Sequence, residues 1–102
     1  MLTSKTEVFR TLAQHQAQLA AFGVARYGVF GSFVRNQVTP DSDVDLLVEF
    51  RPGGKTFENF MNLAWFLEEL LGRPVDLVTT ESLSPYLGPK ILREVEYAPR
   101  LA

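Results

Sequence analysis

The segment Asp43-Val-Asp-Leu-Leu-Val-Glu-Phe50 constrains the fold of this chain most, because its acidic start gives way to an apolar run. Apolar and β-branched residues in a run of this length are typical of a β-strand. The latter half carries apolar residues at successive positions, which indicates burial. The sequence therefore predicts a strand over 43–50 that enters the core in its latter half.

Helix and strand patterns alternate along the rest of the chain. Ser4 and Glu7 have the spacing of a capping box, while Thr56 and Gly72 can cap the two ends of a longer helix. We predict helices over 5–22, 33–37 and 57–71, strands over 26–30, 43–50 and 74–79, and a broken helical region over 83–95. This order predicts an α+β fold, in which a small mixed sheet has helices packed largely on one face and acidic residues at one edge.

The length and the helix patterns predict one core. A chain of 102 residues has room for one domain, over 1–102. The helix over 57–71 carries Phe57, Phe60 and Met61 at helical spacing, and we expect this stripe to be core. His15 lies on the apolar stripe of the first helix, where a half-buried structural histidine is expected rather than a catalytic one.

Composition and charge exclude several classes of protein. Ten basic against twelve acidic residues give a net charge of −2, so broad nucleic-acid binding is not expected. The absence of cysteine excludes disulfides, thiolate nucleophiles and cysteine-based metal sites. The chain begins without a signal-peptide pattern and has no apolar run of the ~20 residues that cross a bilayer. We expect a cytoplasmic protein that makes no membrane contact.

Three aspartates are placed where they could bind a divalent metal. Asp43 and Asp45 alternate on one strand, so both side chains point to the same face of the sheet. Asp76 begins another apolar strand and can reach the same point if the two strands are neighbours. Like charges this close would repel without metal, whereas carboxylate oxygens are the ligands that Mg²⁺ takes. The pattern predicts a metal site made of these three residues.

A glycine-serine turn precedes the acidic strand. Gly31 allows a ligand to approach the backbone closely, and Ser32 at a helix start offers a hydroxyl and free N–H groups to phosphate oxygens. Arg35, one turn later, adds a forked positive group suited to phosphate. Taken singly, each of these residues has an ordinary structural explanation. Their combination with the three aspartates predicts a site for a nucleotide with its metal.

Two other nucleotide or metal motifs fail on spacing. The aspartates at 41, 43 and 45 resemble the start of an EF-hand loop, but its sixth position is Leu46 and its twelfth is Pro52. Gly54-Lys55-Thr56 resembles the end of a P-loop, but the position of its first glycine is Glu49. Calcium binding of the EF-hand type and a Walker-type nucleotide site are therefore not predicted.

The combined motif resembles a known family. Gly31-Ser32, ten intervening residues and Asp43-x-Asp45 match the motif of the minimal nucleotidyltransferases of the DNA polymerase β superfamily. The resemblance extends to Arg35 and to Asp76 in Val75-Asp-Leu, and it covers roughly 80 of the 102 residues. Asn36 stands where many relatives have glycine, but asparagine also tolerates a left-handed backbone.

This resemblance implies a metal-dependent transfer of AMP from ATP to a hydroxyl group. Asp43, Asp45 and Asp76 would bind Mg²⁺, two ions being expected, and Asp76 would also help to deprotonate the acceptor. Gly31, Ser32 and Arg35 would hold the triphosphate. Free-standing relatives act as antitoxins that AMPylate a HEPN-type ribonuclease toxin, so a HEPN toxin is the expected partner, in a possible homo- or hetero-oligomer. The alternative is a non-catalytic, nucleotide-binding antitoxin that neutralises its partner by covering it.

Overall fold

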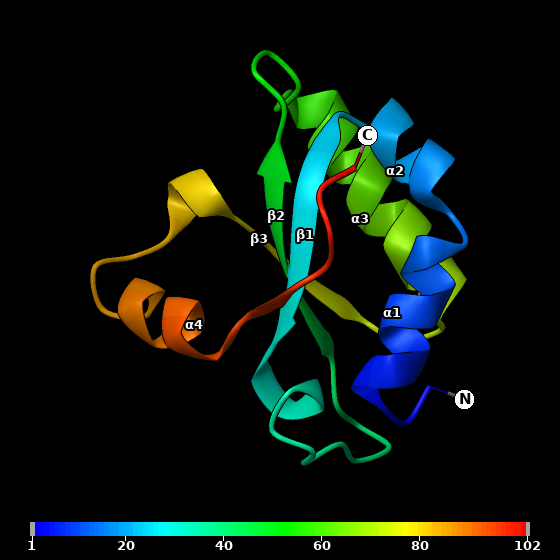
Figure 1. Ribbon diagram of the computed structural model, residues 1–102, viewed down its shortest axis with the longest axis vertical. Helices are drawn as coiled ribbons and strands as arrows, with labels where there is room; N and C mark the ends of the chain where they lie inside the picture. Colours follow the sequence, from blue (N-terminus) through cyan, green and yellow to red (C-terminus); the bar gives the residue numbers. More distant parts are fainter. Residues whose placement is uncertain (1, 102) are drawn as a thin grey trace.

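The computed structural model describes residues 2–101, which form a four-stranded sheet with helices on both sides of it (Figure 1). The chain runs through α1 (Lys5–Ala13), α2 (Gln16–Ala21), β1 (Val24–Phe30), the 3-10 turn η1 (Gly31–Phe33), β2 (Val44–Phe50), α3 (Phe57–Leu71), β3 (Val75–Thr79), the 3-10 turn η2 (Thr80–Ser82), α4 (Gly88–Glu94) and β4 (Glu96–Tyr97). The α+β class predicted from the sequence is confirmed.

The sheet is mixed and has the strand order β3-β2-β1-β4. β1 pairs antiparallel with both β2 and β4, whereas β2 and β3 are parallel. A parallel pair needs a crossover connection, and α3 supplies it. Because β2 and β3 are parallel neighbours, the residues at their N-terminal ends lie next to each other at the same end of the sheet. This topology gives the candidate site its position.

The core lies between one face of the sheet and the first three helices. Val44, Leu46 and Val48 alternate along β2, and they pack with buried leucines of the helices. Figure 1 shows α1, α2 and α3 together on one side of the strands, with α4 on the other. Asp45, which lies between the core residues of β2, points to the opposite face, where it lines a cavity together with Asp76.

Several predicted element bounds differ from the structure. The first helix is divided in two, and His15 lies at the break, where its Nδ1 is 2.8 Å from the carbonyl oxygen of Thr11. The first strand begins at Val24 rather than at 26. The short helix predicted over 33–37 is the 3-10 turn Gly31–Phe33, which contains Ser32 instead of starting after it. β4 was not predicted, because two residues carry too little pattern to indicate a strand.

The prediction that the whole apolar stripe of the long helix is core was partly wrong. Leu67 is buried and Phe60 packs partly buried against the core, but Phe57 and Met61 are 83% and 49% exposed. The helical spacing of the apolar residues correctly predicted an amphipathic helix. However, α3 carries apolar residues around more of its circumference than the sheet can cover. No helix within residues 2–101 is long and apolar enough to cross a membrane.

Candidate active site

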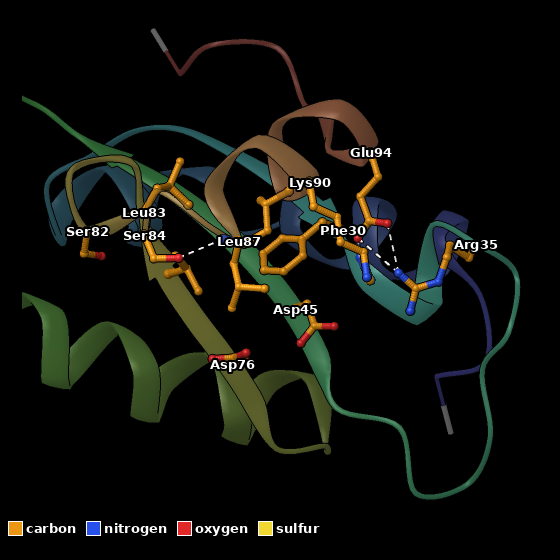
Figure 2. A pocket seen from close by; sticks show the side chains of 13 residues that line it. Phe30, Arg35, Asp45, Asp76, Ser82, Leu83, Ser84, Leu87, Lys90 and Glu94 are labelled. Carbon is orange, nitrogen blue, oxygen red and sulfur yellow. Dashed lines mark hydrogen bonds and ion pairs between the residues drawn. The ribbon is translucent and has the colours of Figure 1, made fainter.

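Two of the predicted acidic residues stand side by side on the open face of the sheet. In the parallel pairing of β2 with β3, Asp45 is opposite Asp76. Figure 2 shows both side chains pointing from their strands into the space below α4. Asp43 precedes β2 by one residue, is exposed, and does not line this space. The structure therefore brings Asp45 and Asp76 together and leaves Asp43 at the margin.

These two aspartates line a cavity of about 350 Å³ between the sheet and α4. Gly31 and Arg35 line the same cavity, whereas Ser32 does not. The far wall comes from η2, the segment after it and α4, and it includes Ser82, Ser84, Leu87 and Lys90. A cavity of this size, lined by both charged and apolar side chains, suits a small molecule that has both characters.

Gly31 is placed so closely against Asp45 that no other residue fits. Its φ of +76° lies in the left-handed region, and a Cβ there would come 1.9 Å from Asp45 Oδ2. The contact arises because Phe30, the last residue of β1, pairs directly with Asp45 on β2. Asn36, for which a left-handed backbone was considered tolerable, has a φ of 58°. The turn thus brings the backbone of Gly31 next to Asp45.

The environment of Asp45 disfavours its charged form. Burial and, after it, the nearby charges of Asp76 and Asp43 together raise the pKa of Asp45 to about 6, although Arg35 acts in the opposite direction. A carboxylate with a raised pKa beside a second carboxylate is typical of a functional site, because a structural site would supply a compensating partner. A bound cation would favour the charged form of both groups.

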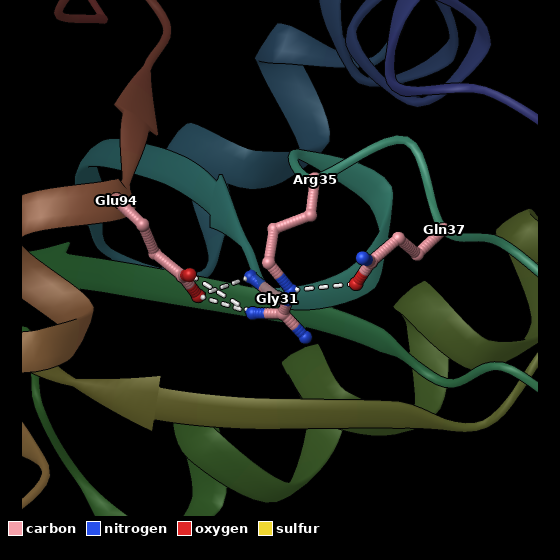
Figure 3. A network of polar contacts seen from close by, with 4 residues as sticks. All are labelled: Gly31, Arg35, Gln37 and Glu94. Carbon is pink, nitrogen blue, oxygen red and sulfur yellow. Dashed lines mark hydrogen bonds and ion pairs between the residues drawn. The ribbon is translucent and has the colours of Figure 1, made fainter.

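Arg35 is held by an acidic residue that the sequence did not single out. Its Nη1 donates to Glu94 Oε1 at 2.9 Å and to Oε2 at 3.2 Å, and its Nε donates to Gln37 Oε1 at 3.0 Å (Figure 3). The N–H of Gly31 donates to the same Glu94 carboxylate at 2.7 Å. Burial alone would raise the pKa of Glu94, but the hydrogen bonds from Gly31 and Arg35 outweigh it and lower that pKa. Glu94 is therefore ionised at neutral pH.

The residues of the far wall were missed for a physical reason. Glu94 is 49 residues from Asp45 in the sequence and reaches the site only because α4 folds back over the sheet. Its residue type and spacing match no motif, and the sequence predicts only a broken helical region over 83–95. Lys90 lies one turn earlier on the same helix, a spacing that places both side chains on one face of α4.

The donor set fits a hard divalent cation, although it is not a closed cage. Within residues 2–101, no three acidic, histidine or cysteine side chains are arranged to surround a metal ion. Asp45 and Asp76 could supply carboxylate oxygens from neighbouring strands, with Asp43 near enough to influence the charge of Asp45. Mg²⁺ is commonly held by one or two carboxylates together with waters and substrate phosphates. The raised pKa of Asp45 is consistent with such a site.

Comparison with known proteins identifies the family. The model of the nucleotidyltransferase domain matches residues 10–98. The chain belongs to the nucleotidyltransferase domain family. Among its relatives in this family is the protein adenylyltransferase MntA of Thermococcus cleftensis, 44% identical over 98 residues that span 95% of this chain and 97% of the relative.

Solved nucleotidyltransferases share the fold. The structure of a minimal nucleotidyltransferase matches with a TM-score of 0.76 and 38% identity, over 93% of this chain and 95% of that one. A chain from the complex of a tri-AMPylated Shewanella oneidensis HEPN toxin with an MNT antitoxin matches with a TM-score of 0.56 and 19% identity, over 83% and 69%. At that identity the second likeness is one of fold alone.

Proposed function

We propose that this nucleotidyltransferase moves AMP from ATP to a hydroxyl group of a partner protein, with Mg²⁺ bound at the acidic pair. One observation carries the proposal: Asp45 and Asp76 adjoin each other in the cavity that also holds the Gly31 N–H and the Arg35 guanidinium. This places ligands for a cation next to donors for phosphate oxygens, which is the combination that phosphoryl chemistry requires.

Different residues of the site would bind the triphosphate, the metal and the nucleoside of ATP. The Gly31 N–H and Arg35 would bind the triphosphate, and Ser32 next to Gly31 remains a proposed contact. Asp43, Asp45 and Asp76 would hold Mg²⁺, with two ions proposed, which would neutralise phosphate charge and align the reacting oxygens. The apolar side chains of the lining, such as Leu83 and Leu87, would pack against the nucleoside.

The transfer step is balanced without further reactants. The acceptor oxygen bonds to the α-phosphorus of ATP, the bond from that phosphorus to the β-phosphate oxygen breaks, and pyrophosphate leaves with that electron pair. Asp76 would take the acceptor proton, because it lies exposed at the cavity on the edge strand β3. The product is a phosphodiester on the acceptor.

The acceptor proposed is a hydroxyl of a HEPN-type toxin, for which this chain would be the antitoxin. The Thermococcus relative is named a protein adenylyltransferase and matches over nearly its whole length, which supports a protein acceptor. The fold is shared with an MNT antitoxin bound to a tri-AMPylated HEPN toxin. We place the reaction in the cytoplasm, where ATP is available, and propose that the whole chain acts as one domain.

Label transfer from ATP tests this proposal. The chain is incubated with α-phosphate-labelled ATP, Mg²⁺ and a HEPN-domain protein as the proposed acceptor. We expect label on the partner, and a rate lower by about 100-fold or more in Asp45→Asn and Asp76→Asn. Asp41→Asn is the matched control, because Asp41 is exposed in the turn before β2 and lies outside the cavity. Equal transfer by all four proteins would exclude the acidic pair from the reaction.

A further inference from the structure

Glu94 holds the same groups that the proposed function assigns to phosphate. The Gly31 N–H and Arg35 Nη1 both donate to its carboxylate, at 2.7 Å and 2.9 Å. A carboxylate and a phosphate oxygen compete for such donors, because both are anionic acceptors of charge-assisted hydrogen bonds. The Gly31 N–H has one hydrogen, so an incoming phosphate cannot accept from it while Glu94 does, and at Arg35 the two anions would repel each other.

The contact is better shielded than an ordinary surface ion pair. The side chain of Glu94 is 19% exposed and that of Arg35 is 43% exposed, and the Gly31 N–H adds a hydrogen bond from a buried backbone. Exposed ion pairs contribute little, but one that shares a backbone donor and is partly desolvated contributes more. A ligand that displaces Glu94 from Arg35 and Gly31 must therefore offset the free energy of these contacts, which weakens its measured affinity.

We infer that Glu94 is a specificity-determining residue, which occupies the phosphate donors until a polyphosphate displaces it. This inference rests on the proposed function. A triphosphate carries several charges and can replace both contacts at once, whereas a single small anion gains less than it displaces. Lys90 lines the same cavity one turn earlier on α4, so the released carboxylate stays within reach of a positive group.

The position of Glu94 in the chain makes the exchange feasible. Glu94 is the last residue of α4 and directly precedes Val95 and the edge strand β4. A side-chain rotation can withdraw the carboxylate without unfolding the sheet, since β4 pairs with β1 through residues beyond it. The device needs no movement of the strands that carry Asp45 and Asp76.

Calorimetric titration of Glu94→Gln with inorganic tripolyphosphate and with ATP and Mg²⁺ tests the inference. Gln keeps the length of the side chain but removes the competing charge, so we expect both ligands to bind about tenfold more tightly than to the wild type. Glu94→Asp, whose carboxylate falls short of the donors, should also bind them more tightly. Glu96→Gln is the matched control, because Glu96 is two residues away and pairs with Lys5 outside the cavity.

The possible outcomes separate the inference from the proposed function. Unchanged or weaker binding by Glu94→Gln and Glu94→Asp, with wild-type transfer intact, overturns the inference alone and makes Glu94 a support for Arg35. Tighter polyphosphate binding without any transfer from ATP supports the inference and overturns the proposed function. If no variant binds either ligand, both fall. A shift of the Gly31 amide resonance during titration with tripolyphosphate would show that the ligand replaces Glu94 at the Gly31 N–H.

Discussion

Gly31 is the residue at which the site tolerates least change. Its backbone has a φ of +76°, and the space where a side chain would begin is taken by Asp45 Oδ2. Gly53 has the same φ, but a Cβ there would meet nothing within 4 Å. The two glycines therefore separate the cost of a left-handed backbone from the cost of displacing the carboxylate.

We predict that Gly31→Ala loses transfer activity and more stability than Gly53→Ala. Gly53→Ala should lose only about 1–2 kcal/mol, the cost of the left-handed backbone. Gly31→Ala bears that cost and must also displace the carboxylate of Asp45. Thermal unfolding and label transfer measure the two effects. Equal stability and full transfer in both variants would contradict the close contact.

The raised pKa of Asp45 predicts a pH-dependent stability without metal. Between about pH 4 and pH 6 the folded state binds more protons than the unfolded state, because the pKa of Asp45 rises from 3.8 to about 6 on folding. The stability that this protonation contributes is present at low pH and is lost as pH rises through about 6.

Asp45→Asn should therefore be more stable than the metal-free wild type at pH 7.5, and the gain should shrink towards pH 4. Unfolding in denaturant across this range, with chelator present, measures the difference. Asp41→Asn serves as the control, since Asp41 is exposed in a turn and should follow the wild type. A loss of stability in Asp45→Asn at pH 7.5 would indicate a structural carboxylate instead.

At the scale of elements, buried Arg73 fixes the loop that leads into the acidic strand. Arg73 follows α3 and is 5% exposed. Its guanidinium donates to the carbonyl oxygens of Leu2 at 2.6 Å, Thr39 at 2.9 Å and Ser42 at 2.8 Å. One forked group thus ties the N-terminal segment and the loop before Asp43 to the start of β3.

Arg73→Lys should cost about 2 kcal/mol or more of stability, because one ammonium cannot satisfy carbonyls lying in several directions. Arg10→Lys, at an exposed position of α1, should change stability little. Denaturant unfolding of both variants measures the difference. Equal midpoints would show that the fork of Arg73 adds nothing beyond its charge.

Elements with local signals were predictable from the sequence, and elements made by distant contacts were not. Thr56 accepts from the Asn59 N–H, and Gly72 ends α3 in a left-handed conformation, both as predicted. Ser4 caps the first helix, although Glu7 reaches back to Thr3 rather than completing the capping box. The break at His15 and the strand β4 depend on tertiary packing, which no local pattern reports.

The site follows the same division. The parallel pairing brings Asp76 beside Asp45 as expected, whereas Asp43 precedes β2 and lies outside the cavity lining, so its metal contact stays a prediction. Ser32 lies inside its 3-10 turn and outside the cavity lining, so its phosphate contact stays a prediction. Glu94 could not be predicted, because only the folding of α4 over the sheet brings it to Arg35.

At the scale of the whole molecule, an enzyme and a covering protein make different demands on one chain. Covering a partner requires only a surface, whereas transfer requires the cavity between the sheet and α4 to be open to an acceptor from outside. Asp76 is exposed on the edge strand, which leaves that approach available. The two functions therefore differ in whether a covalent bond on the partner persists after the complex is separated.

Intact-mass spectrometry of the proposed HEPN-domain acceptor, separated after incubation with this chain, ATP and Mg²⁺, tests most directly whether such a bond is formed. The wild type should add about 329 Da per AMP to the partner, which should remain inactive after separation because a phosphodiester persists when binding contacts do not. Asp45→Asn should add no mass and leave the separated partner active. A partner that is fully inhibited in the complex, unmodified in mass and active again after separation would contradict the account.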